Sequence, residues 1–267
     1  MRTVNDIIQS LELLAPIKTA FDWDNVGLLI GDRHKSVQKI LVALDCTNEI
    51  VDEAEQLAAD IIITHHPLIH DALKSITTDT PAGRRIIRLI KADISLFSAH
   101  TNLDIAKGGV NDVLFNTLEL TDKEHLFPPD SDEAGLGRIG SLQTPMPLNE
   151  FASFIGQKLN LTHTRYVGNP TALIYKTGLV CGSGSRNKFF VQAAEKGCQA
   201  YITGDIKYHD AQTAKDMELY LIDATHYASE VLVVESLCTY LRTSFPQAEV
   251  LAAKYDKQMG GNFEYNN

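Results

Sequence analysis

Two adjacent histidines, His65 and His66, follow the apolar run Ile61–Ile63 and a threonine. The three isoleucines predict a fully buried strand, and Pro67 ends it. The histidines are therefore expected where a strand leaves its sheet, which is the edge where open α/β sheets bind ligands. Neutral imidazole is the commonest metal ligand in proteins. From the pair alone, a metal site and a pair of surface histidines in a loop are about equal alternatives.

Two other histidines each have a carboxylate four residues downstream: His100 with Asp104, and His226 with Glu230. Each of these histidines follows a predicted apolar strand. Residues four apart share one face of a helix, so His226 and Glu230 can hold one ion or bridge two. One such pair alone is more often an ordinary exposed helix pair. Three strand ends that all carry metal-ligating residue types favour a metal site.

The pooled candidates combine imidazoles with carboxylates. Such a set suits Zn, Fe, Mn or Ni, and a shared carboxylate suits two ions about 3.5–4 Å apart. The sequence therefore predicts divalent metal binding by His65, His66, Asp104, His226 and Glu230. His100 is predicted to lie beside these ligands, where it orients a ligand or a water molecule and transfers protons, rather than binding an ion itself.

The predicted strands and helices alternate, as in α/β proteins. In the first half, strands are predicted at 39–45, 61–63 and 94–99, and helices at 47–59 and 80–91. The first β-α-β unit predicts two parallel neighbouring strands with a right-handed crossover.

The second half of the chain repeats this plan. The segments 63–72 and 202–211 both begin with Ile-Thr and end with His-Asp-Ala at the same spacing, which suggests a duplicated fold. The best linker contains Pro128 and Pro129, followed by polar residues. We therefore predict two similar, interlocked α/β domains with the metal site between them. Residues 1–128 carry the His-His motif, and residues 129–267 carry the His-x-x-x-Glu motif.

Composition narrows the class of protein. Of 267 residues, 44% are hydrophobic and 22% are charged, as in soluble globular proteins. There is no apolar run of about 18 residues, so no membrane span is predicted. Four scattered cysteines without a C-x-x-C pair favour reduced thiols and a cytosolic protein. The net charge of −10 disfavours nucleic acid as a partner but allows a small anionic substrate, because a bound metal reverses the local field.

Several other features have competing interpretations. Asp22 and Asp24 are candidate ligands, but hydrogen bonds within their own loop are the favoured role. Gly182–Arg186 is either a phosphate-binding turn or, as we favour, a tight turn with Ser185 capping the next helix. Cys181 is expected to be a small buried residue rather than a nucleophile. The pair His209 and Asp210 is expected to pack at a helix start.

The sequence also resembles a known family on five motifs that span nearly the whole chain. These motifs are Trp23–Leu28, Ile63–Leu68, His100–Asp104, Gly135–Gly140 and His226–Glu230. The chain is similar to the Nif-three-like family of dinuclear-metal proteins, often labelled GTP cyclohydrolase type 2 homologues. The resemblance implies two similar α/β domains, a two-metal site with the five ligands named above, and a homohexamer with a central cavity. The chain is too short for the extra middle domain of longer members.

Two classes of function fit these predictions. The first is a cytosolic two-metal hydrolase that acts on a nucleotide or phosphoester, as in GTP cyclohydrolysis. The second is a non-catalytic assembly that stores, delivers or senses metal. A substrate pocket with basic residues beside the metals would favour the first class, and the candidates are Lys207, Arg186 and Arg138. Residues from Lys254 onward are predicted to form a frayed tail or an interface arm.

Overall fold

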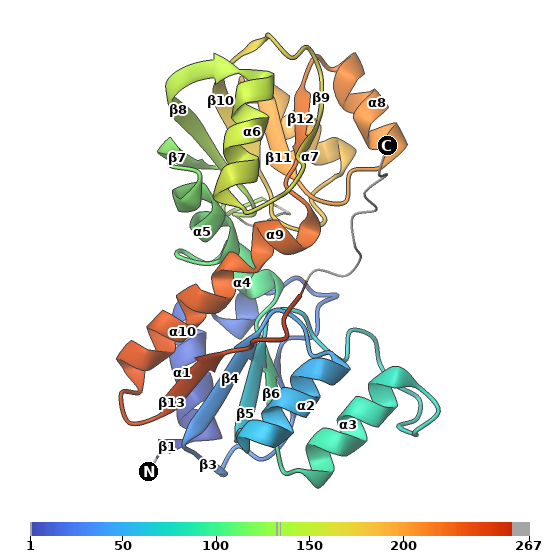
Figure 1. The fold of residues 1–267 in the computed structure, drawn as a ribbon, viewed down its shortest axis with the longest axis vertical. Coiled ribbons are helices and arrows are strands. Elements are labelled where there is room, and N and C mark those ends of the chain that lie inside the picture. The colour runs from blue at the N-terminus through green and yellow to red at the C-terminus, as the bar shows by residue number, and fades with distance from the viewer. Residues whose placement is uncertain (1, 132, 134, 258–267) are drawn as a thin grey trace.

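The computed structural model describes residues 2–131, 133 and 135–257. Two α/β halves lie end to end along the long axis of the molecule, as Figure 1 shows. Each half is built around one large sheet, which confirms the predicted α/β fold class. Two short strands, β1 (Arg2–Thr3) and β3 (Ser36–Val37), form a separate antiparallel pair beside the first half.

The first sheet has the strand order β13-β4-β5-β6-β2. Its strands are β2 (Gly27–Ile30), β4 (Lys39–Ala43), β5 (Ile61–Thr64), β6 (Ser95–Ser98) and β13 (Glu249–Ala252). The strands β13, β4, β5 and β6 are parallel, and β2 is antiparallel to β6. The predicted parallel pairing of the strand before the His-His motif with the motif's own strand is confirmed.

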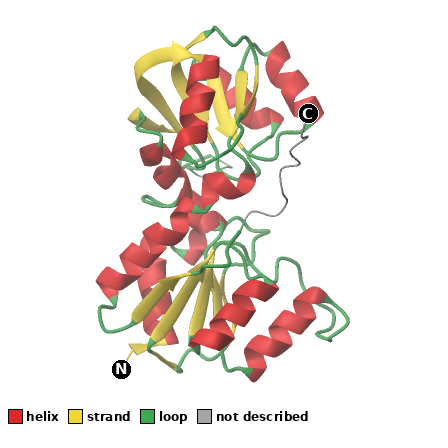
Figure 2. Cartoon of the chain, in the orientation of Figure 1, coloured by secondary structure: helices red, strands yellow, loops and turns green. Residues whose placement is uncertain are grey.

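Helices cover both faces of this sheet (Figure 2). One face packs against α2 (Asn48–Leu57) and α3 (Pro81–Lys91), and the other packs against α1 (Val4–Leu14) and α10 (Leu232–Ser244). Ile62 faces the α2 and α3 side, whereas Ile61 and Ile63 face the opposite side, because side chains alternate along a strand. Thr3 and Thr47 each accept a backbone N–H hydrogen bond and so cap α1 and α2.

The second sheet has the strand order β7-β8-β10-β11-β12-β9. Its strands are β7 (Thr121–His125), β8 (Arg138–Pro147), β9 (Arg165–Val167), β10 (Leu173–Leu179), β11 (Ala200–Thr203) and β12 (Tyr220–Asp223). Apolar residues of α6 (Leu148–Lys158) pack on one face, and those of α7 (Asn187–Glu195) and α8 (Tyr208–Asp216) pack on the other.

The two sheets share a four-strand core with the same topology. In the first sheet, β4, β5 and β6 are parallel neighbours, and β2 lies antiparallel at the far side of β6. In the second sheet, β10, β11 and β12 are parallel neighbours, and β9 lies antiparallel beside β12. The predicted duplication is therefore present in the strand order. The halves differ beyond this core, where β13 is parallel to β4 but β8 is antiparallel to β10.

The halves are interlocked by strands and by a common core. Relative to the predicted boundary after residue 128, β7 precedes the boundary but joins the second sheet, and β13 follows it but joins the first. Helices α5 (Val110–Thr117) and α10 contribute to one apolar cluster that includes residues of both sheets.

The shorter helices lie near the junction of the halves. They are η1 (Ile17–Thr19), α4 (Thr101–Ile105) and α9 (His226–Glu230). Figure 1 shows α4 and α9 between the two sheets. Both follow the third parallel strand of their own sheet, and both are five residues long. The repeat therefore places two equivalent short helices on opposite sides of the same junction.

The C-terminal segment returns to the first half. The backbone N–H groups of Lys254 and Tyr255 donate hydrogen bonds to the carboxylate of Glu53, and the backbone N–H of Leu44 donates to the Asp256 carboxylate. Lys254, Tyr255 and Asp256 are therefore held against the first half rather than frayed. The rest of the predicted tail, residues 258–267, lies outside the described residues. No helix in the described part of the chain is long and apolar enough to cross a bilayer.

Candidate metal centre

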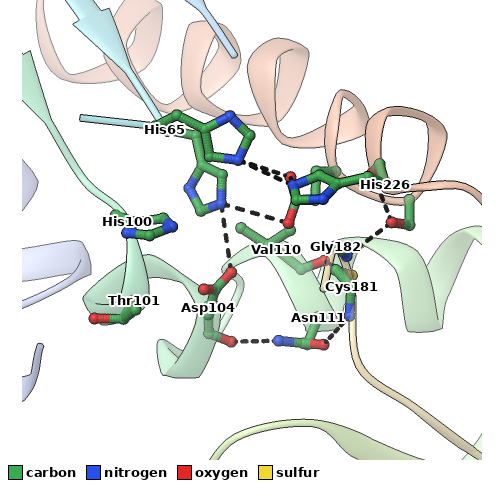
Figure 3. Close-up of polar contacts among 12 residues, drawn as sticks. His65, His100, Thr101, Asp104, Val110, Asn111, Cys181, Gly182 and His226 are labelled. Atoms are coloured by element: carbon green, nitrogen blue, oxygen red, sulfur yellow. Dashed lines mark hydrogen bonds and ion pairs between the residues drawn. The ribbon is translucent and has the colours of Figure 1, made fainter. Parts of the chain in front are cut away.

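The junction between the sheets brings together all five predicted ligands. His65 and His66 follow β5, Asp104 lies in α4, and His226 and Glu230 lie in α9. Figure 3 shows the labelled side chains of His65, Asp104 and His226 pointing toward one another from different elements. The first half of the chain therefore supplies three of the residues and the second half supplies two. The potential ligand atoms lie within 4.8 Å of one another in the group His66, His226 and Glu230, and also in the group His65, Asp104 and Glu230.

Glu230 occupies the centre of this group, and its two carboxylate oxygens face different partners. Oε2 lies 3.0 Å from Nε2 of His66 and 3.0 Å from Nε2 of His226. Oε1 lies 3.9 Å from Nε2 of His65, which is also 3.6 Å from Oδ1 of Asp104. Two groups of potential ligands therefore share this one carboxylate. This is the arrangement expected of a carboxylate that bridges two ions.

His65 carries a lone pair that no described residue satisfies. Its Nδ1 lies 2.8 Å from the carbonyl oxygen of Ala99, which only accepts, so Nδ1 carries the proton. Burial lowers the pKa of His65 to about 3, so the ring is neutral and Nε2 is unprotonated. His65 Nε2 and Asp104 Oδ1 both lack a hydrogen-bond partner among the described residues. Two buried acceptors that face each other need a cation or a proton between them.

His66 and His226 are each held by a carboxylate on the far side of the ring. Nδ1 of His66 lies 2.9 Å from Asp45, and Nδ1 of His226 lies 2.7 Å from Asp205. A carboxylate behind an imidazole fixes the ring orientation and strengthens it as a ligand. Burial lowers the pKa of His66, but hydrogen bonds to Asp45 and Glu230 outweigh it and raise the pKa to about 10. The hydrogen bond to Glu230 raises the pKa of His226 to about 9.

The two buried carboxylates of the cluster respond in opposite directions. Burial and then the charge of Glu230 raise the pKa of Asp104 to about 7. Burial also penalises the charge on Glu230, but hydrogen bonds to His226 and His66 hold its pKa well below its usual range. In the metal-free protein, protonated His66 and His226 therefore act as the counter-cations of Glu230. Asp104 is partly protonated near neutral pH. A divalent ion would replace those protons.

Asp45 and Asp205 were not predicted from the sequence. Each lies two residues beyond the end of a parallel strand, Asp45 after β4 and Asp205 after β11. That position, at the ligand-binding edge of the sheet, was the available signal. Nothing in the spacing paired them with His66 and His226, which are more than 20 residues away in the sequence.

His100 lies beside the cluster and forms a third group of potential ligands with His65 and His66. Its predicted role as a neighbour of the ligands therefore stays a prediction. Its ring centre is 5.2 Å from that of His65 and 5.6 Å from that of His66. Nδ1 of His100 lies 2.9 Å from Oδ1 of Asp24, so Asp24 orients the ring. Asp24 also accepts hydrogen bonds from the N–H and hydroxyl of Thr101, and these partners lower its pKa to about 2 against the effect of burial. The predicted local role of Asp24 was incomplete, because its main partners lie 76 and 77 residues away.

The Gly182–Arg186 turn was predicted to end in a Ser185 cap, and this prediction was wrong. The residue preceding α7 is Arg186, whose side chain makes no capping hydrogen bond. The Ser185 hydroxyl instead donates to Asp210, which also accepts from the backbone N–H of Lys207. Gly182 lets the turn approach Glu230 closely: its φ is +61°, and a Cβ at this position would lie 1.9 Å from Oε1 of Glu230.

The backbone before His226 is strained. Thr225 has φ 57° and ψ 156°, a region that β-branched residues rarely adopt. Its N–H donates to Asp223, and its hydroxyl accepts from the N–H of Ala228, so hydrogen bonds on both sides hold the conformation. Gly204 lies against this turn, where a Cβ would be 2.5 Å from the backbone nitrogen of His226. These contacts fix the start of α9 and hence the direction of His226.

The three predicted basic residues have different outcomes. Arg138 is buried, pairs with Asp112 at 2.5 Å, and donates to backbone carbonyls, so it serves the fold. Lys207 lies at the exposed start of α8 and lines a different groove, together with Tyr208 and Arg165. Arg186 lines a cavity that reaches His226 and Glu230.

Two remaining predictions concern residues outside the ligand set. Cys181 is buried, its thiol donates to the carbonyl of Val110 at 3.6 Å, and burial raises its pKa well above the usual value, so it is no nucleophile. His209 is exposed in the first turn of α8, as expected for a residue at a helix start.

Comparison with known proteins identifies the family. The model of the Duf34/NIF3 (NGG1p interacting factor 3) family matches residues 2–258. The chain belongs to the NIF3 family. A relative from Clostridium perfringens is 45% identical over 232 residues, covering 85% of this chain and 86% of the relative. One from Streptococcus pneumoniae is 35% identical, covering 89% of each chain. Both carry the name GTP cyclohydrolase 1 type 2 homolog.

Solved structures of NIF3 relatives have the same fold. A Bacillus cereus protein related to NIF3 matches with a TM-score of 0.89 and 28% identity, covering 99% of both chains. Reduced HcgD from Methanocaldococcus jannaschii matches with a TM-score of 0.82 and 29% identity, covering 95% of this chain and 98% of that one. The family resemblance drawn from the five motifs is therefore confirmed.

Two cavities flank the cluster of this NIF3 protein. One, of about 450 Å³, is lined by His66 and His226 together with Asp45, Asp205 and Arg165. The other, of about 460 Å³, reaches His226 and Glu230 from the side of His100 and Asp104, and Trp23 and Arg186 line its outer part. Both volumes lie in the range of small-molecule sites. The cluster is thus accessible from two sides.

Proposed function

We propose that the chain binds two divalent metal ions and hydrolyses a nucleotide or phosphoester. The name of its relatives, GTP cyclohydrolase 1 type 2 homolog, supports a nucleotide. The observation that carries the proposal is the position of Glu230. Its Oε2 faces His66 and His226, and its Oε1 faces His65, which in turn faces Asp104. One ion would lie between His66, His226 and Glu230. The second would lie between His65, Asp104 and Glu230.

The donor set fits transition metals better than Mg²⁺ or Ca²⁺. Imidazole nitrogens suit Zn, Fe and Ni, whereas Mg²⁺ and Ca²⁺ prefer oxygen ligands. The orphaned atoms of His65 and Asp104 also fit, because a cation between them would satisfy both. Bound divalent ions would lower the pKa of a water molecule toward 7 and hold an oxygen of the substrate.

The protein residues would supply binding and proton transfer. His100 lies at the edge of the cluster, lines the cavity that also holds Trp23 and Arg186, and is oriented by Asp24. With Nδ1 held by a carboxylate, Nε2 of His100 is left to exchange a proton with a substrate or water in the cavity. Asp45 and Asp205 would keep His66 and His226 aimed at the metals.

The test is a screen of metal-reconstituted protein against nucleotides and phosphoesters, with metal content measured in parallel. Glu230→Gln keeps the shape of the side chain but removes its charge, so it should lose metal and activity together. His209→Gln is a matched control and should leave both unchanged, since His209 is exposed on α8 and belongs to none of the groups of potential ligands. Metal content near zero in gently purified wild type and after reconstitution would reject the proposal. A loaded protein that hydrolyses none of the compounds would favour the alternative of a metal-storing or metal-sensing assembly.

A further inference from the structure

The two cavities beside the cluster have different chemistry. The first cavity is acidic, because Asp45, Asp205 and Asp223 all line it. Its cations are Arg165, which is paired with Asp223, and Lys257. An anionic ligand would meet three carboxylates there, and the one arginine is already paired with a carboxylate. The second cavity has a different lining and is the better candidate for a negatively charged substrate.

Aromatic side chains form one wall of the second cavity. Trp23, the only tryptophan of the chain, is 56% exposed. Phe21 stacks beside it, with the ring centres 6.0 Å apart. Trp23 also lies 6.1 Å from the ring of His100, edge to face. A large aromatic ring left exposed at the mouth of a cavity offers a surface for a planar ligand. The aromatic wall thus extends from solvent to His100, the residue proposed to transfer protons.

Arg186 is the uncommitted cation of this cavity. Its guanidinium makes no hydrogen bond or ion pair with any residue in the described ranges, and its central carbon lies over the ring of Phe189, 5.9 Å from the ring centre. Lys188 also lines the cavity, but it is paired with Glu133. Two of the four acidic residues in the lining, Asp104 and Glu230, are proposed metal ligands whose charge the ions would neutralise. Asp22 and the paired Glu133 are the others.

We propose that this second cavity is the substrate compartment and that it takes an aromatic heterocycle carrying an anionic group, such as a mononucleotide. The ring packs against Trp23 and Phe21, and the anionic group binds Arg186. The proposal rests on the proposed function for the presence of the cluster, but it concerns recognition rather than hydrolysis. It selects nucleotides over simple phosphoesters, because a phosphoester without a ring would leave the aromatic wall unused.

The single tryptophan makes the test direct. Tryptophan fluorescence of the Zn²⁺-reconstituted protein is titrated with GMP, guanosine and ribose 5-phosphate. GMP should change the emission at the lowest concentration, because only GMP engages both the wall and Arg186. Arg186→Ala should weaken GMP binding by about tenfold or more, the value of a charge-assisted contact, and leave guanosine binding unchanged. Arg186→Lys should restore part of the loss.

Arg165→Ala is the matched control, since it removes an arginine from the acidic cavity on the other side of His226. It should leave the GMP titration unchanged. Equal binding of GMP and ribose 5-phosphate would overturn the role of the aromatic wall. A loss of GMP binding in Arg165→Ala but not in Arg186→Ala would overturn the choice of cavity, as would no GMP binding at all. Because binding is read without turnover, GMP binding that depends on Arg186 in an inactive protein would reject only the hydrolase, and activity without such binding would reject only this compartment.

Discussion

Gly182 and Glu230 lie so close together that only glycine fits: a Cβ at position 182 would lie 1.9 Å from Oε1 of Glu230. The N–H of Gly182 donates to the hydroxyl of Ser229, which donates in turn to the carbonyl of His226. The turn after β10 therefore packs directly against α9, the short helix that carries the proposed ligands His226 and Glu230.

The first prediction follows from this contact. Gly182→Ala should displace the Glu230 carboxylate and strongly reduce bound metal, measured by elemental analysis. Gly197→Ala is the matched control, because Gly197 also has a positive φ (76°) but has open space where a Cβ would point. Both variants should lose about 1 kcal/mol or more of stability from the unfavourable backbone conformation. Equal metal content in the two variants would contradict the proposed role of Glu230.

The second prediction concerns stability. Metal that binds only the native state must raise the unfolding temperature. In wild type the gain should be large, because ions would join α4 and α9 across the junction of the two halves. Glu230→Gln should lose most of it. Asp24→Asn should keep it, since Asp24 contacts His100 and Thr101 rather than a proposed ligand. Thermal melts with and without added Zn²⁺ measure both effects, and the same gain in wild type and Glu230→Gln would refute the idea.

The third prediction is a pH dependence. The pKa values of His66 and His226 are raised to about 10 and 9 in the metal-free protein. Protonation of these rings therefore contributes stability that is complete below their ordinary pKa near 6.5 and is lost as pH rises toward 9–10. Metal binding has the opposite trend, because ligands must lose their protons, so apparent affinity should increase with pH over this range.

Calorimetry in buffers of different ionisation enthalpy would measure the protons released on metal binding at pH 7. Release should be clear in wild type and smaller in His66→Gln, which has no proton to give up at that position. Metal binding that is independent of pH between 6.5 and 9 would show that the ion does not displace protons from these histidines.

The fourth prediction concerns assembly. From the family resemblance we expect a homo-oligomer, specifically a hexamer. Light scattering on purified protein measures the mass directly. A mass of 29.5 kDa, that of one chain, would contradict an oligomer.

The sequence by itself predicted the local elements and all five proposed ligands. Three isoleucines stopped by Pro67 predicted the buried strand β5, and the spacing of His226 and Glu230 predicted a shared helical face. These signals are local, so periodicity and residue type are enough to find them. The repeated Ile-Thr and His-Asp-Ala pieces were also visible in the sequence, and they match the shared strand order of the two sheets.

Only the tertiary structure decided which distant groups meet. Asp24 meets His100 across 76 residues, and Asp45 meets His66 across 21. The close fit of Gly182 against Glu230 depends on how two distant segments of the second half pack. The return of β13 to the first sheet depends on how the two halves interlock. A local pattern carries no information on such pairings, because they are set by how distant segments of the chain pack together and not by the spacing of residues within one element.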